Sequence, residues 1–137
     1  MEEETVLNFL KRHGLESKQG QSILAEKILS KENWLVSVFK KNKQKSYCIN
    51  FSKNELVLIP LDEKTTSLKE GIYNQIPLSE IKELYFEKPA ADNELVVKYE
   101  DDSKPIEHYF IPQENAVSPW HSRNLMHLME EIGTKNK

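Results

Sequence analysis

The chain has a single cysteine, Cys48, so it cannot form an internal disulfide bridge. Its N-terminus, Met1-Glu2-Glu3-Glu4, is acidic where a secretory signal would be basic. Both features favour a reducing compartment. No apolar run approaches the roughly 18 residues that a membrane-spanning helix needs. The sequence therefore predicts a soluble, cytoplasmic protein.

Glycine is also scarce: the four glycines stand far apart, at positions 14, 20, 71 and 133. There is no glycine-rich phosphate loop, dinucleotide fingerprint, nucleophile elbow or paired Cys/His spacing. His121 and His127 are six residues apart on a predicted helix, about 600° of rotation, so they do not share a metal ion. We therefore expect a protein that is not an enzyme and that uses neither a cofactor nor a metal.

The remaining reactive side chains are expected to be structural. Cys48 lies between apolar neighbours in a predicted strand, which favours a buried and inert thiol. By strand alternation His108 shares a face with Ile106 and Phe110. This position favours a packed or half-buried histidine over a catalytic one.

Short strand-like segments, by contrast, are abundant. Apolar residues alternate or run together every dozen or so positions, and polar turns separate them, which is typical of a small barrel or sandwich. The run at 55–61 is almost continuously apolar, which predicts burial on both faces. Seven strands are predicted, at residues 34–40, 46–51, 55–61, 72–78, 81–87, 95–100 and 106–111.

An amphipathic helix is predicted after the last strand. Ser118 is suited to be its N-cap and Pro119 its first residue, where the missing N–H costs nothing. Apolar side chains form one stripe as far as Ile132, with His121 at the edge of the stripe, and Gly133 ends the helix. We expect this helix to dock on the sheet.

Two further helices are predicted ahead of the strands. Apolar residues recur with helical spacing at 2–13, and Gly14 is a suitable stop. Ser17 or Ser22 is expected to cap a second helix, which is supported by two i, i+4 pairs, Leu24 with Ile28 and Ala25 with Leu29. The N-terminal part is thus predicted to be a helical hairpin.

Seven strands followed by one helix resemble the pleckstrin-homology (PH) superfold. The stretch from Ile76 to Phe86, IPLSEIKELYF, is similar to the middle strands of bacterial PH-like and GRAM-like domains. The resemblance implies two sheets packed nearly orthogonally, with the helix closing one open corner. The fold class expected is α+β, mainly β: a seven-stranded bent sheet or partly open barrel. The helical hairpin at 1–32 would precede the PH-like domain at 33–137.

Some PH domains bind phosphoinositides through a basic first hairpin, and the corresponding stretch here contains Lys40, Lys41, Lys43 and Lys45. Ammonium groups on an exposed turn attract an anionic headgroup, by about 1 kcal/mol each near a membrane. Lys45, however, stands where the family pattern has arginine, and lysine lacks the bidentate fork that grips phosphate. Lysine-rich turns also keep sheet edges soluble without binding anything.

The charge distribution adds a further alternative. The formal net charge is −3, yet residues 11–53 hold most of the basic side chains. Aromatic residues in this section are compatible with nucleic-acid binding, but the net negative charge and the lack of a recognised motif argue against it. We predict a non-catalytic binding or scaffold module of a bacterial cytoplasm that engages a protein. Binding of anionic lipid through the four lysines is the alternative, and an exposed edge strand such as 72–78 also permits a homodimer.

Overall fold

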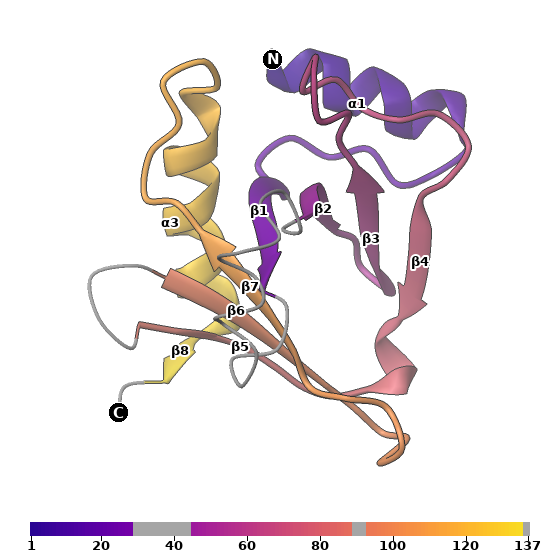
Figure 1. The fold of residues 1–137 in the computed structure, drawn as a ribbon, viewed down its shortest axis with the longest axis vertical. Helices are drawn as coiled ribbons and strands as arrows, with labels where there is room; N and C mark the ends of the chain where they lie inside the picture. The colour runs from indigo at the N-terminus through magenta and orange to yellow at the C-terminus, as the bar shows by residue number, and fades with distance from the viewer. Residues whose placement is uncertain (29–44, 89–92, 136–137) are drawn as a thin grey trace.

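The computed structural model describes residues 1–28, 45–88 and 93–135 (Figure 1). The chain begins with helix α1 (Glu3–Arg12) and ends with helix α3 (Trp120–Ile132) followed by a short strand. The strands are β1 (Ser22–Ile28), β2 (Lys45–Phe51), β3 (Glu55–Pro60), β4 (Asn74–Pro77), β5 (Ile81–Glu87), β6 (Asn93–Tyr99), β7 (Glu107–Ile111) and β8 (Thr134–Lys135), with a 3-10 turn η2 (Leu78–Glu80) between β4 and β5.

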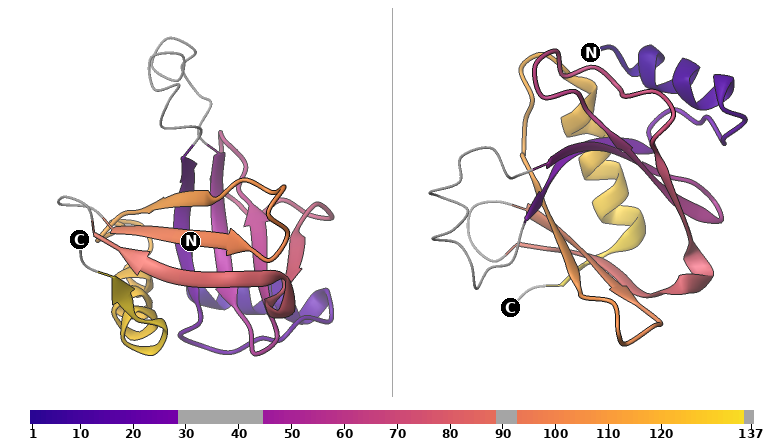
Figure 2. Two further views of the ribbon diagram at one scale, coloured as in Figure 1. Left: turned by 90° about the horizontal axis from the view of Figure 1, so that it is seen from below. Right: turned by 45° about the vertical axis from the view of Figure 1, so that its right-hand side comes forward.

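The strands form one sheet in the order β4-β3-β2-β1-β7-β6-β5-β8. All pairings within it are antiparallel except that of β5 with β8, which is parallel. Figure 2 shows that β5, β6 and β7 cross the first four strands at a steep angle, so the sheet is strongly bent. The predicted fold class, mainly β with an open, bent sheet and a C-terminal helix, is confirmed.

The prediction of a second helix in the N-terminal hairpin is wrong. Residues 22–28 form β1, which lies in the middle of the sheet between β2 and β7. Both faces of β1 are buried: Ile23 and Ala25 face one core, and Leu24 faces another. A strand buried on both sides has no polar alternation, so its apolar residues matched helical spacing by chance. The predicted strand at 34–40 lies outside the described residues.

The other strand predictions are confirmed as β2 to β7; the bounds of β5 are as predicted, and those of the others differ by one or two residues. Strand β8 was not predicted. The expected burial of β3 on both faces is also confirmed, because Leu56 and Leu58 face the inner core while Val57 and Ile59 face the opposite side.

Two hydrophobic cores result from the bend. The inner core lies between the two halves of the sheet and includes Leu125 and Leu128 of α3. The outer core lies under α1, where Val6, Phe9 and Leu10 pack on the far face of β1, β2 and β3. The amphipathic stripes of both helices are therefore covered, and each helix docks on the sheet as its apolar spacing requires.

The start of α3 differs from the prediction. The Ser118 hydroxyl makes no capping bond to the helix; it donates to the Met1 carbonyl oxygen at 3.0 Å. The Trp120 indole N–H donates to the same oxygen at 2.7 Å. Met1 therefore packs against this turn, and its carbonyl oxygen accepts a hydrogen bond from the Ser118 hydroxyl that would otherwise cap the helix.

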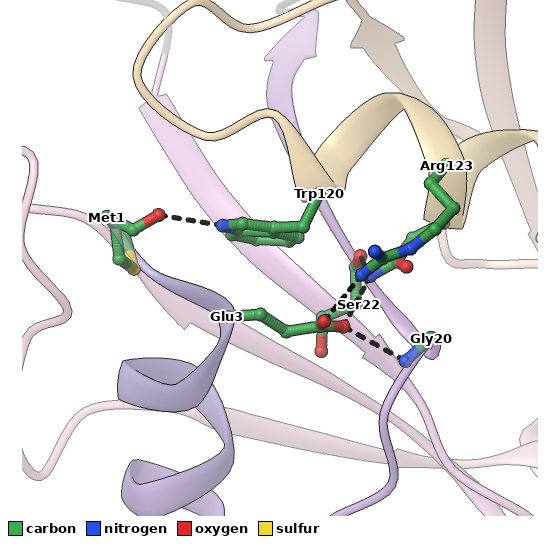
Figure 3. A network of polar contacts seen from close by, with 7 residues as sticks. Met1, Glu3, Gly20, Ser22, Trp120 and Arg123 are labelled. Atoms are coloured by element: carbon green, nitrogen blue, oxygen red, sulfur yellow. Dashed lines mark hydrogen bonds and ion pairs between the residues drawn. The ribbon is translucent and has the colours of Figure 1, made fainter.

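A buried carboxylate joins the two helices (Figure 3). Glu3 is only 8% exposed, and its Oε1 accepts a hydrogen bond from Arg123 Nη2 at 2.9 Å. Its Oε2 accepts from Asn124 Nδ2 at 2.8 Å and from the Gly20 N–H at 3.0 Å. The network fixes α1, the approach to β1 and α3 relative to one another.

Candidate functional site

The described residues form several concave surfaces, and two of them bear on function. The first is a polar cavity of about 290 Å³. It lies at the end of the sheet where β1 ends and where a turn joins β6 to β7, which we call the open end. We call this cavity the open-end cavity. Its lining residues come from six strands and two turns: Lys27, Tyr47, Leu58, Asn74, Gln75, Ile76, Glu80, Tyr99, Lys104, Glu107 and Tyr109.

The charges of the open-end cavity are paired within it. Lys27 Nζ lies 2.9 Å from Glu107 Oε2, while the hydroxyls of Tyr99 and Tyr109 donate to Glu107 Oε1. Burial, and then the Glu107 carboxylate, raise the pKa of both phenols, so they stay protonated and keep donating. Lys104 lies over the Tyr99 ring, 5.1 Å from its centroid. Lys104 Nζ also lies 3.9 Å from Glu80 Oε1, so the carboxylates of Glu80 and Glu107 balance the two lysines.

Of the four lysines in the predicted lipid site, the structure describes Lys45. Lys45 is exposed at the start of β2, and the register places it directly opposite Lys27 of β1. Lys40, Lys41 and Lys43 lie in the connection between β1 and β2, outside the described residues. Sequence reasoning missed Lys27 because β1 matched helical spacing.

The second concave surface is a groove of about 410 Å³ with a mixed apolar and charged lining, which we call the β5–α3 groove. Leu84 of β5, Leu78 of η2 and Leu128 of α3 line it together with other apolar side chains, Phe51, Leu56 and Ile132. Charged residues share the lining: Glu16, Lys18, Lys53, Glu55 and Glu131. Leu78 is a large apolar side chain with 37% of its surface exposed, so part of the groove faces solvent.

The outer edge of β5 runs beside this groove. Strand β8 pairs with only its last two residues, Phe86 with Thr134 and Glu87 with Lys135. The Phe86 N–H donates to the Gly133 carbonyl oxygen at 3.1 Å. Gly133 has a φ of 102°, a left-handed backbone that turns the chain from α3 into β8. Sequence patterns gave no signal for the groove, because its walls come from separate segments.

The side chains considered as candidates for chemistry, those of His121, Cys48 and His108, are buried or half-buried. His121 is fully buried; its Nδ1 accepts from the Leu24 N–H at 3.0 Å, and its Nε2 lies 2.6 Å from the Pro112 carbonyl oxygen. Burial lowers the pKa of His121 and so favours the neutral ring. Burial raises the pKa of the Cys48 thiol to about 12, as expected for an inert cysteine. His108 is half-buried, 3.7 Å from Glu94.

Within residues 1–28, 45–88 and 93–135, no group of three or more His, Cys, Asp or Glu side chains is placed to hold a metal ion. In the same residues, no helix combines the length and the apolar content that crossing a membrane requires.

No protein-family model and no curated protein matches this chain. Among solved structures it is similar to the hSac2 domain from the human phosphoinositide phosphatase Sac2, with a TM-score of 0.53 and 9% sequence identity. The match covers 98% of this chain and 87% of that one. At this identity the likeness concerns the fold alone. It fits a bent antiparallel sheet with a C-terminal helix, and loosely a PH-like fold.

Proposed function

We propose that this chain is a non-catalytic, PH-like module that binds another protein in the β5–α3 groove. The observation that carries the proposal is the group of apolar side chains in the lining of the groove, of which Leu78 is 37% exposed. Large apolar side chains that gather in a solvent-facing groove and have charged neighbours are typical of protein-interaction sites.

The surroundings of His121 and Glu107 support a non-catalytic role. A catalytic histidine needs a ring nitrogen that reaches the substrate. Both ring nitrogens of His121 are engaged by backbone groups, those of Leu24 and Pro112. In the open-end cavity Glu107 is engaged by two phenols and Lys27, so it is not poised as a free base.

The proposal is tested by capture from an extract of the source cells, with the full chain as bait. Leu78→Glu places a charge in the groove, whereas Met126→Glu changes an apolar side chain of α3 that is 59% exposed and outside the groove. We expect a protein that the wild type and Met126→Glu retain and Leu78→Glu loses by about tenfold or more, since burying a leucine contributes about 1.5–3 kcal/mol. Equal retention by all three chains would contradict the proposal.

Anionic-lipid binding is a second candidate, favoured by the cross-strand pair of Lys27 and Lys45 at the base of the first hairpin. The Glu107 carboxylate weakens it, because it neutralises Lys27. Cosedimentation with anionic vesicles at low and physiological salt tests it, with all four predicted lysines, Lys40, Lys41, Lys43 and Lys45, replaced by alanine. Salt-sensitive binding that the replacement abolishes would support it; no binding, or binding unaffected by the replacement, would remove it.

Nucleic-acid binding, a homodimer and a location in a bacterial cytoplasm stay predictions. Light scattering over a concentration series addresses the homodimer.

A further inference from the structure

We propose that the open-end cavity binds a small organic cation, with an alkylammonium or quaternary ammonium group, and that the Lys104 side chain takes the place of this ligand in its absence. The site is separate from the β5–α3 groove, so the proposal goes beyond protein binding there and does not depend on it.

Lys104 shows how the cavity holds an ammonium group. Its Nζ lies 5.1 Å from the centroid of the Tyr99 ring and 3.9 Å from Glu80 Oε1. The face of an aromatic ring attracts a cation, and sites for quaternary ammonium ligands are built from such rings. The turn between β6 and β7 thus supplies, from the chain itself, the chemical group that we expect the cavity to take from solution.

Lys104 is also held weakly. It belongs to an exposed stretch, residues 100–106, and 49% of its side chain is exposed. An ion pair in such a position contributes little to stability, and salt screens it. The Lys104 N–H donates to the Asp101 carbonyl oxygen at 3.0 Å, so the turn does not depend on the side chain. A ligand can therefore displace the ammonium group without disrupting the turn.

The charge left in the cavity without Lys104 specifies the sign of the ligand. Lys27 Nζ lies 2.9 Å from Glu107 and neutralises it, whereas Glu80 loses the ammonium group of Lys104. The lining then holds one lysine and two glutamates, a net charge of −1. A monocation restores neutrality, while an anion would meet the Glu80 carboxylate.

The remaining rings and the volume favour a compact ligand. Tyr47 and Tyr109 also line the cavity, with ring centroids 6.1 Å apart and an interplanar angle of 85°. Tyr99 and Tyr109 donate hydrogen bonds to Glu107, which polarises the phenols and strengthens the attraction of their rings for a cation. The cavity, about 290 Å³, is close to the lower limit of about 300 Å³ for small-molecule sites. We therefore expect a ligand of about the size of choline.

Titration of the full chain with choline, followed by NMR, tests the site. The control ligands are 3,3-dimethyl-1-butanol, which has the shape of choline without its charge, and inorganic phosphate, which has the opposite charge. We expect choline to shift the signals of Tyr99 and Lys104 to a plateau and the two controls to leave them unchanged. Equal shifts with choline and the alcohol would overturn the proposal.

Lys104→Ala removes the competing ammonium group, and Lys98→Ala is its matched control. Lys98 has similar surroundings, 5.7 Å from the Tyr85 ring centroid and 3.8 Å from Glu83. It precedes Tyr99 in β6, so it points to the opposite face of the sheet and does not line the cavity. Both substitutions remove one positive charge. We expect Lys104→Ala to tighten choline binding about fivefold, as loss of a competing exposed cation–π contact predicts, and Lys98→Ala to leave it unchanged.

Glu80→Gln and Glu100→Gln each remove one negative charge at an exposed position, but only Glu80 lines the cavity. We expect Glu80→Gln to weaken choline binding about fivefold and Glu100→Gln to have little effect. Equal affinities of the Lys104→Ala and Lys98→Ala chains would overturn the role of Lys104. If neither the wild type nor Lys104→Ala binds choline saturably, the cation site itself is overturned, and protein binding in the β5–α3 groove is unaffected.

Discussion

Glu3 and Arg123 form an ion pair at 2.9 Å although 120 positions separate them in the sequence. The carboxylate is buried, whereas the Arg123 side chain is 64% exposed. Water can therefore solvate the guanidinium if the pair is broken, but the groups around the buried carboxylate would lose a charged acceptor. The pair joins α1 to α3, and α3 in turn forms one wall of the β5–α3 groove.

Glu3→Gln keeps the shape of the side chain and removes its charge. We expect this change to lower the free energy of unfolding by about 1.5–3 kcal/mol, the usual contribution of a hydrogen bond to a charged group. Glu4→Gln is the control, because Glu4 is exposed in the same helical turn. Urea unfolding of both variants measures the difference, and equal stabilities would show that the network contributes nothing.

The buried His121 predicts a dependence of stability on pH. Burial lowers its pKa in the folded state, so the unfolded chain binds the proton more readily. The stability that His121 contributes is complete above its pKa in the unfolded chain, about 6.5. It is lost as the pH falls towards the lower pKa of the folded state. His121→Gln retains one donor and one acceptor but does not titrate.

Thermal unfolding between neutral and mildly acidic pH tests this expectation. The wild type should lose more stability on acidification than His121→Gln, and the difference between the two isolates His121 from the other three histidines. Parallel pH profiles would refute the assignment.

Cys48 should be unreactive in the folded protein. Its side chain is completely buried, and the raised pKa, about 12, leaves almost no thiolate at neutral pH. We expect a thiol reagent such as Ellman's reagent to modify it only as fast as the chain unfolds. Rapid modification without denaturant, at a rate proportional to reagent concentration, would contradict the observed packing.

Glu107 should stabilise the open end of the sheet. It accepts hydrogen bonds from Tyr99 and Tyr109 and pairs with Lys27. Glu107→Gln should therefore cost about 1–3 kcal/mol, whereas Glu100→Gln, at an exposed position nearby, should cost little. Equal unfolding midpoints in urea for the two variants would rule out this role.

Periodicity predicted the elements that have one buried and one exposed face. Helices α1 and α3 and the strand β5 emerged close to their true bounds, because each shows its own spacing of apolar residues. Strand β1 did not, because its apolar residues also fit i, i+4 helical spacing and both of its faces are covered, one by the inner core and the other by α1. Strand β3 is likewise buried on both faces, but its longer, almost continuous apolar run still predicted a strand. Burial of that kind depends on tertiary structure, and it removes the alternation by which a strand is recognised.

The candidate sites likewise differ in whether their residues are neighbours in the sequence or meet only in the folded chain. The lysine cluster was visible because its members are neighbours in the sequence. The β5–α3 groove was not, since Leu78, Leu84 and Leu128 come together only when η2, β5 and α3 pack. Glu3 was also hidden, because an acidic residue near a helix start is ordinarily exposed; here Arg123 and Asn124 cover it.

Backbone amide NMR of the full chain, with a captured partner added stepwise, distinguishes the two concave surfaces directly. If the partner binds in the β5–α3 groove, the amide signals of Leu78, Leu84 and Leu128 should shift and reach a plateau as partner is added. The amide signals of Lys27 and Tyr99 in the open-end cavity should not shift. Saturating shifts at Lys27 and Tyr99, with the groove residues unchanged, would contradict the proposal and make the open-end cavity the binding site.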